Sequence, residues 1–230
     1  MNFIILTVIA LAFSLVAARS IRSIPWLWYG IAIAIDILYF YGVVYSLPPS
    51  ILQPLSFVVQ RGLFATALFV VIMYCGVFPE NSFVRKTIGP IRAELSIIAS
   101  IFAFAHCYNY LTSYIGVLTQ HIDVINSNQL ASLIIAIILL IMLVVLCVTS
   151  IKQIKKAMSK GLWKNIQRTA YVFFALIYIH ELLILYPSAL KGIGDARSML
   201  IIEGVVFGAY FVARSIRYVL DKKAKAGSLD

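Results

Sequence analysis

The stretch IRAELSIIASIFAFAHCYNYLTSYIGVL, residues 91–118, is apolar enough to cross a membrane as a helix, yet it carries His106 near its centre. About 20 consecutive apolar residues span the hydrocarbon core of a bilayer. An imidazole in such surroundings needs partners for its ring nitrogens. The chain has three histidines, so the interpretation of this one depends on where His121 and His180 lie.

The overall composition places nearly the whole chain in a membrane. Of its 230 residues, 62% are hydrophobic and 12% are charged, and the mean hydropathy is +0.97. Soluble domains are about half apolar and about a quarter charged. We therefore expect an all-α integral membrane protein, multi-pass in the cell (plasma or inner) membrane, without room for a soluble domain of about 100 residues.

Apolar stretches separated by turn residues or charges predict a bundle of seven transmembrane helices. The expected helices are residues 2–18, 25–46, 57–78, 93–117, 130–150, 169–187 and 198–219. We divide the chain into an N-terminal helix with its basic loop (1–24), a six-helix domain (25–219) and a basic cytoplasmic tail (220–230). The first helix ends in LVAARS, as a signal peptide could, but no positive charge precedes it, so we expect it to be retained.

The distribution of basic residues predicts the orientation of the bundle. The loop between the fifth and sixth expected helices is strongly basic, whereas residues 118–129 contain no Lys or Arg. Because cytoplasmic loops are enriched in these residues, we expect the N-terminus outside and the C-terminus inside. The same effect explains the net charge of +10, and we expect no nucleic-acid partner. The basic residues of that loop are Lys152, Lys155, Lys156, Lys160, Lys164 and Arg168.

The predicted topology puts His106 and His180 at similar depths. His106 lies 13 residues after Ala93 and His180 lies 11 residues after Thr169, on helices that run in the same direction. At the rise of an α-helix the two depths differ by only about 3 Å. His121, in contrast, is expected in the outer loop, as a solvated side chain or a contact for a partner.

Three explanations for this pair remain open from the residues alone. The imidazoles could bond hydroxyls or carbonyls of neighbouring helices, form a proton relay, or ligate one haem iron from two facing helices. A zinc site is disfavoured, because it requires a third or fourth protein ligand.

Four features of the chain resemble the ferric reductase-like transmembrane domain family. They are RGLFATALF (61–69), IRAELSIIASIFAFAHCYNYL (91–111), TSIKQIKKAMSKGLWKNIQRTAYVFFALIYIH (149–180) and the six-helix pattern that ends in a basic tail. Within that family the chain is most similar to haem-binding membrane subunits that supply electrons to periplasmic methionine sulfoxide reductase. The resemblance extends from the third expected helix to the seventh.

The resemblance implies a b-type cytochrome, the electron-transfer subunit of an oxidoreductase. It implies that His106 and His180 are axial ligands of one haem b, and it matches Arg61 to an arginine that could bind a haem propionate or lie at the membrane interface. Electrons would pass from quinol or a cytoplasmic flavin reductase, with quinone or flavin supplied by partners, to an extracytoplasmic redox protein or ferric iron. Membrane lipid is the other expected partner.

One departure from the family pattern bears on the number of haems. Related proteins commonly have another histidine about a dozen residues before the one matching His180, whereas Gln167 and Arg168 occupy that region here. A second haem with two histidine ligands is therefore not expected.

A different functional class also fits the residues. A haem-free transporter or assembly factor would use the histidines as structural or proton-relay groups, and Asp36 and Glu181 could likewise hold a proton or pair with another helix. Transporters often contain inverted repeats and broken helices, and neither is evident in the sequence.

Overall fold

In the computed structural model, residues 2–41, 48–120 and 125–226 are described, and within these ranges every regular element is a helix. The elements, in chain order, are α1 (Asn2–Val16), α2 (Ala18–Ser23), α3 (Pro25–Phe40), α4 (Pro49–Val58), α5 (Leu63–Tyr74), α6 (Phe83–Ile88), the 3-10 helix η2 (Gly89–Ile91), α7 (Arg92–Gln120), α8 (Ser127–Ser150), α9 (Lys152–Ala157), α10 (Lys160–Arg168), α11 (Ala170–Leu190) and α12 (Ala196–Ala226).

Four helical segments are long and apolar enough to cross a membrane, which agrees with the prediction of an all-α membrane protein. They are Phe83–Thr119, Ser127–Ser150, Lys160–Leu190 and Ala196–Lys223. Three further apolar helices are shorter, namely Phe3–Val16, Pro25–Phe40 and Leu63–Tyr74. Each of these three falls below the length of about 20 residues that a perpendicular crossing requires.

The third expected helix, residues 57–78, is not continuous, so this part of the prediction is wrong. Helix α4 ends at Val58 and α5 begins at Leu63. Gly62 separates them with φ +66°, a left-handed conformation that interrupts a right-handed helix and favours glycine. The chain therefore makes a turn at residues 60–62, where a straight span was expected.

The basic segment between α8 and α11 was expected to be a loop, but it forms the short helices α9 and α10. Ser159 begins α10, because its hydroxyl accepts a hydrogen bond from the Leu162 N–H. The Trp163 indole N–H then donates to the Thr149 carbonyl at 3.0 Å, which ties α10 to the end of α8.

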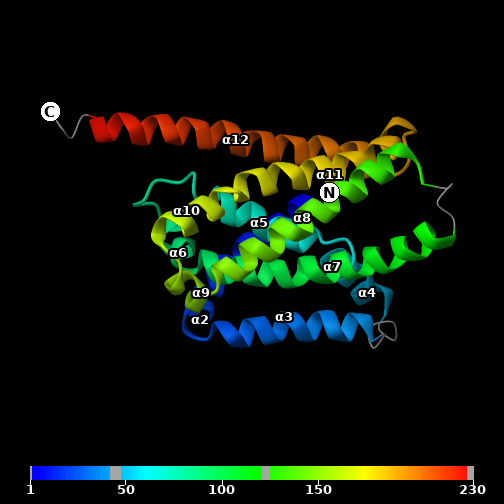
Figure 1. The fold of residues 1–230 in the computed structure, drawn as a ribbon, viewed down its shortest axis with the longest axis horizontal. Helices are drawn as coiled ribbons and strands as arrows, with labels where there is room; N and C mark the ends of the chain where they lie inside the picture. The colour runs from blue at the N-terminus through cyan, green and yellow to red at the C-terminus, as the bar shows by residue number, and fades with distance from the viewer. Residues whose placement is uncertain (1, 42–47, 121–124, 227–230) are drawn as a thin grey trace.

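Helix α5 lies at the centre of the packing (Figure 1). Its residues Ala67 and Leu68 pack with α1 and α7, and its residues Leu63, Val70 and Met73 pack with α11 and α12. Around this centre, α3 packs against α7, and α8 packs against both α7 and α11. This arrangement brings His106 of α7 and His180 of α11 into the same bundle, around α5 and α8.

Candidate functional site

The imidazole of His106 is oriented by the backbone of the turn between α4 and α5. Its Nδ1 atom lies 2.8 Å from the Gln60 carbonyl oxygen. A carbonyl oxygen only accepts hydrogen bonds, so His106 donates from Nδ1–H. In the neutral ring Nε2 then carries a lone pair, and it can act as an acceptor or as a metal ligand.

Gly62 allows this turn to approach the imidazole closely. A Cβ atom placed on Gly62 would lie 3.0 Å from Cγ and 3.1 Å from Nδ1 of His106. Both the left-handed backbone and the lack of space therefore favour glycine. On the other side the Tyr110 ring contacts the imidazole, with ring centroids 4.9 Å apart.

His180 is oriented in a similar way by α8. Its Nδ1 lies 3.1 Å from the Ser132 carbonyl oxygen and 2.9 Å from the Ser132 hydroxyl oxygen. The hydroxyl of Ser132, which is 1% exposed, can also donate to the His180 carbonyl at 3.4 Å. The backbone carbonyl again requires the Nδ1–H tautomer, which leaves the lone pair on Nε2.

The two histidines thus share one arrangement although they lie on different helices. Each Nδ1–H is bound to a backbone carbonyl of another element, and within the described ranges no hydrogen bond joins either Nε2 to a protein atom. Metal-ligating histidines are commonly held by their second nitrogen in this manner.

The backbone of Arg61 belongs to the same turn as Gln60 and Gly62. Its N–H donates to the Ser56 carbonyl at 3.0 Å, and the residue as a whole is exposed. The structure therefore places His106 beside the turn that contains Arg61, and His180 beside Ser132 of α8. His121 lies outside the described residues.

Sequence reasoning did not identify Gln60, Gly62 or Ser132 as parts of this site. Two of them carried a signal: Gly62 is a glycine at the start of an apolar run, and Ser132 is a hydroxyl in the apolar 130–150 segment. Gln60 carried none, because its contribution comes from its backbone.

Two buried carboxyl groups, Glu203 and Asp36, lie in apolar surroundings. Glu203 of α12 is 0% exposed, and neither of its carboxyl oxygens has a hydrogen-bond partner among the described residues. An ionised carboxylate is costly in such an interior unless it is paired. Asp36 is 8% exposed in a groove of about 420 Å³ between α3 and α7, and its Oδ1 has no hydrogen-bond partner among the described residues.

A larger cavity of about 900 Å³ lies at the basic end of the bundle, where α5 and α8 end and α7 and α11 begin. Its described lining contains eight basic and two acidic side chains and no histidine. Gln167, at the position where a further ligand was considered, also lines this cavity. Its amide donates to the Thr149 hydroxyl at 2.9 Å, so the side chain is held by the end of α8.

Within the described ranges, no group of three or more His, Cys, Asp or Glu side chains could hold a metal ion by itself. The candidate donors are instead the Nε2 atoms of two imidazoles, His106 and His180, whose Nδ1 atoms are bonded to backbone carbonyls. A pair suits a metal whose remaining ligands come from a macrocycle, as in haem.

Comparison with known proteins adds one relative and no family. No family model matches the chain. A protein of Treponema pallidum (strain Nichols), described as uncharacterized, is 30% identical over 166 residues, which are 72% of this chain. The match covers 46% of that protein, so the chain spans less than half the length of this relative.

Proposed function

We propose that the protein is a membrane b-type cytochrome in which His106 and His180 hold one haem. The observation that carries the proposal is the matched tautomer of the two rings, with Nδ1–H bound to the carbonyls of Gln60 and Ser132. Both Nε2 atoms are thereby prepared as neutral ligands. The resemblance to ferric reductase-like transmembrane domains supports the same assignment.

The residues around the imidazoles would act by positioning them. The Gln60 and Ser132 carbonyls fix the tautomer and the ring plane, and Gly62 permits the first of these contacts. Arg61, in the same turn, is proposed to pair with a propionate. The haem itself would supply one-electron chemistry, and the apolar surroundings would influence its reduction potential.

We propose that the bundle crosses the plasma or inner membrane seven times, with the N-terminus outside. The three shorter apolar helices α1, α3 and α5 would cross together with the four longer segments. The basic residues of α9, α10 and the end of α12 support placing that end of the bundle in the cytoplasm.

Electrons would enter from quinol or a cytoplasmic flavin reductase and leave to an extracytoplasmic redox protein or ferric iron. The protein would thus serve as the electron-transfer subunit of an oxidoreductase. One haem per chain is proposed, because Gln167 replaces the additional histidine and is bonded to Thr149.

An optical spectrum of protein purified after haem-replete expression tests this function. Sharp reduced-minus-oxidised bands are expected, with one haem per chain, and they should be lost in His106→Ala and His180→Ala. His121→Ala is the matched control and should retain the bands. Purified wild-type protein without haem would contradict the proposal, and two haems per chain would contradict the ligand count.

A second candidate, a haem-free transporter, is favoured by two observations. The helix break at Gly62 resembles the discontinuous helices of transporters, and the buried carboxyl of Glu203 could carry a proton. In that case His106→Gln should leave cofactor content unchanged, and transport assays in proteoliposomes should depend on pH rather than on redox state.

A further inference from the structure

We propose that the cavity at the basic end of the bundle is a binding site for a phosphate-bearing amphiphile, which is a molecule with an apolar or aromatic body and a phosphate group. The proposal does not depend on haem binding. The cavity volume of about 900 Å³ falls within the range typical of small-molecule sites, about 300–1,000 Å³.

The charge of the cavity lining favours an anion. Five arginines and three lysines line it, against Glu80 and Asp221, so the excess is six positive charges (eight minus two). Asp221 is already paired with Arg217 at 2.8 Å. Guanidinium groups bind phosphate oxygens in pairs of parallel hydrogen bonds, so converging arginines suit this group. The arginines are Arg85, Arg92, Arg168, Arg214 and Arg217.

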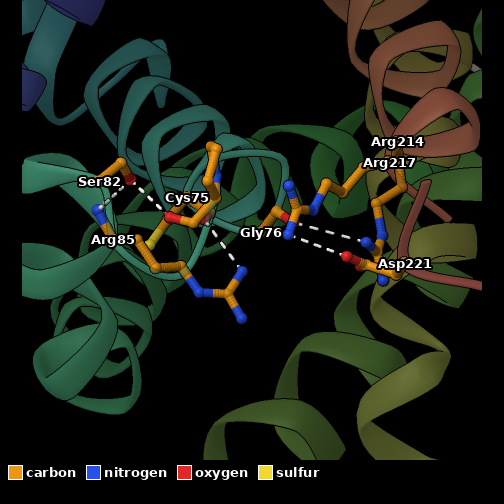
Figure 2. A network of polar contacts seen from close by, with 8 residues as sticks. Cys75, Gly76, Ser82, Arg85, Arg214, Arg217 and Asp221 are labelled. Carbon is orange, nitrogen blue, oxygen red and sulfur yellow. Dashed lines mark hydrogen bonds and ion pairs between the residues drawn. The ribbon is translucent and has the colours of Figure 1, made fainter. Parts of the chain in front are cut away.

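Two of these arginines are held in place by the end of α5 (Figure 2). Arg85 donates from Nη1 to the Cys75 carbonyl at 3.3 Å, and Arg214 donates from Nη1 to the Gly76 carbonyl at 3.4 Å. Figure 2 shows them reaching this point from opposite sides. Arg214 also donates from Nε to the Tyr171 hydroxyl at 3.1 Å. These contacts to carbonyls use some of the N–H donors of each guanidinium group. They orient the two side chains before a ligand binds.

Arg92 indicates that the lining is incomplete without a ligand. Its Nε atom is buried and has no hydrogen-bond partner among the described residues. Buried polar groups are nearly always hydrogen-bonded, and burial of an unpaired charged group is costly. Orientation by the positive-inside effect explains basic residues in loops, but it does not require a buried guanidinium nitrogen without a partner.

The remaining walls indicate what the phosphate is attached to. Phe69, Met73, Phe173 and Phe174 line the cavity beside the basic groups. These side chains suit acyl chains or a planar ring system. Two sources share this chemistry, an anionic phospholipid and an aromatic nucleotide.

Binding of two matched probe pairs to the purified full chain tests the site. Dioctanoyl phosphatidylglycerol is compared with dioctanoylglycerol, and flavin mononucleotide with riboflavin, so that each pair differs by its phosphate-containing group. Affinity is measured by native mass spectrometry and thermal shift. We expect the phosphate-bearing member of one pair to bind at least about tenfold more tightly, because only that member can form charged hydrogen bonds with the arginines. The pair that responds identifies the source.

Cavity variants then locate the binding. Arg92→Gln, Arg214→Gln and the exposed Arg168→Gln should each weaken it, the first two by about tenfold. Arg197→Gln, an exposed position at the other end of α12, is the control and should bind like the wild type. Because Arg168 is exposed, its variant is expected to fold even if the others do not. The proposal is overturned if neither pair shows a phosphate preference, if the cavity variants bind like wild type, or if a second haem occupies the cavity.

Discussion

The region around His106 and His180, here called the histidine level, and the basic end of the bundle differ in how their polar groups are paired. At the histidine level, each imidazole has one backbone carbonyl partner, and no cation is needed to satisfy it. At the basic end, eight cationic side chains share one cavity with two acids. Under our two proposals, the first region would bind a metal complex through neutral ligands and the second would bind an anion. Variants that affect one region and spare the other can therefore test the distinction.

The largest effect is expected from removing either imidazole. His106→Ala and His180→Ala should abolish the haem bands, because the one imidazole that remains would not hold the haem by itself. Phosphate-ligand binding at the basic end should stay unchanged in both variants. Absorption spectra and the probe titrations measure the two properties on the same samples, and loss of both together would contradict the separation of the regions.

Gly62→Ala should have the next largest effect. A side chain at φ +66° and a Cβ atom 3.0 Å from the His106 ring should together cost about 1–3 kcal/mol and displace the imidazole. We expect lower thermal stability and lower haem occupancy. Gly30→Ala, where a Cβ would meet nothing within 4 Å, is the matched control. Equal haem occupancy in the two variants would show that the turn does not position His106.

Ser132→Ala should have a smaller effect on the same region. It removes the hydroxyl 2.9 Å from His180 Nδ1 but keeps the carbonyl at 3.1 Å, so the tautomer is preserved. We expect haem to be retained, with a changed midpoint potential in redox titration. Complete loss of haem would mean that the hydroxyl, and not the backbone, orients the ring.

Lys152→Ala should have the smallest effect on these two regions, since Lys152 contacts neither histidine and does not line the cavity. Lys152 forms an ion pair with the buried Glu94 at 2.8 Å, but its own side chain is 62% exposed. The variant leaves the buried Glu94 carboxyl without its cation, so we expect the free energy of unfolding to fall by about 1–3 kcal/mol, without a change in haem bands or probe binding. Chemical denaturation measures the free energy of unfolding. A loss of haem bands in this variant would contradict the independence of the histidine region from the basic end.

The local sequence was sufficient to predict the helical class and most helix positions, because hydropathy and turn residues are local properties. The error in residues 57–78 arose from Gly62, whose effect on an apolar run depends on the packing around it. The basic segment 151–168 was expected to be a loop, because it has no apolar stretch from which a membrane span is predicted. The structure instead contains the short helices α9 and α10 there. The position of α10 depends on tertiary contacts such as the hydrogen bond from the Trp163 indole to the Thr149 carbonyl.

By itself the sequence determined that this chain is an apolar helical protein with a basic end and two histidines at similar predicted depth. Tertiary structure decided what those residues face. The Gln60 carbonyl reaches His106 across 46 residues, Ser132 reaches His180 across 48, and Arg214 reaches Gly76 across 138. Such contacts depend on how helices pack. Every residue has a backbone carbonyl, so the sequence does not identify which carbonyl forms the contact. The tautomers and the convergence of the arginines therefore became visible only in the folded bundle.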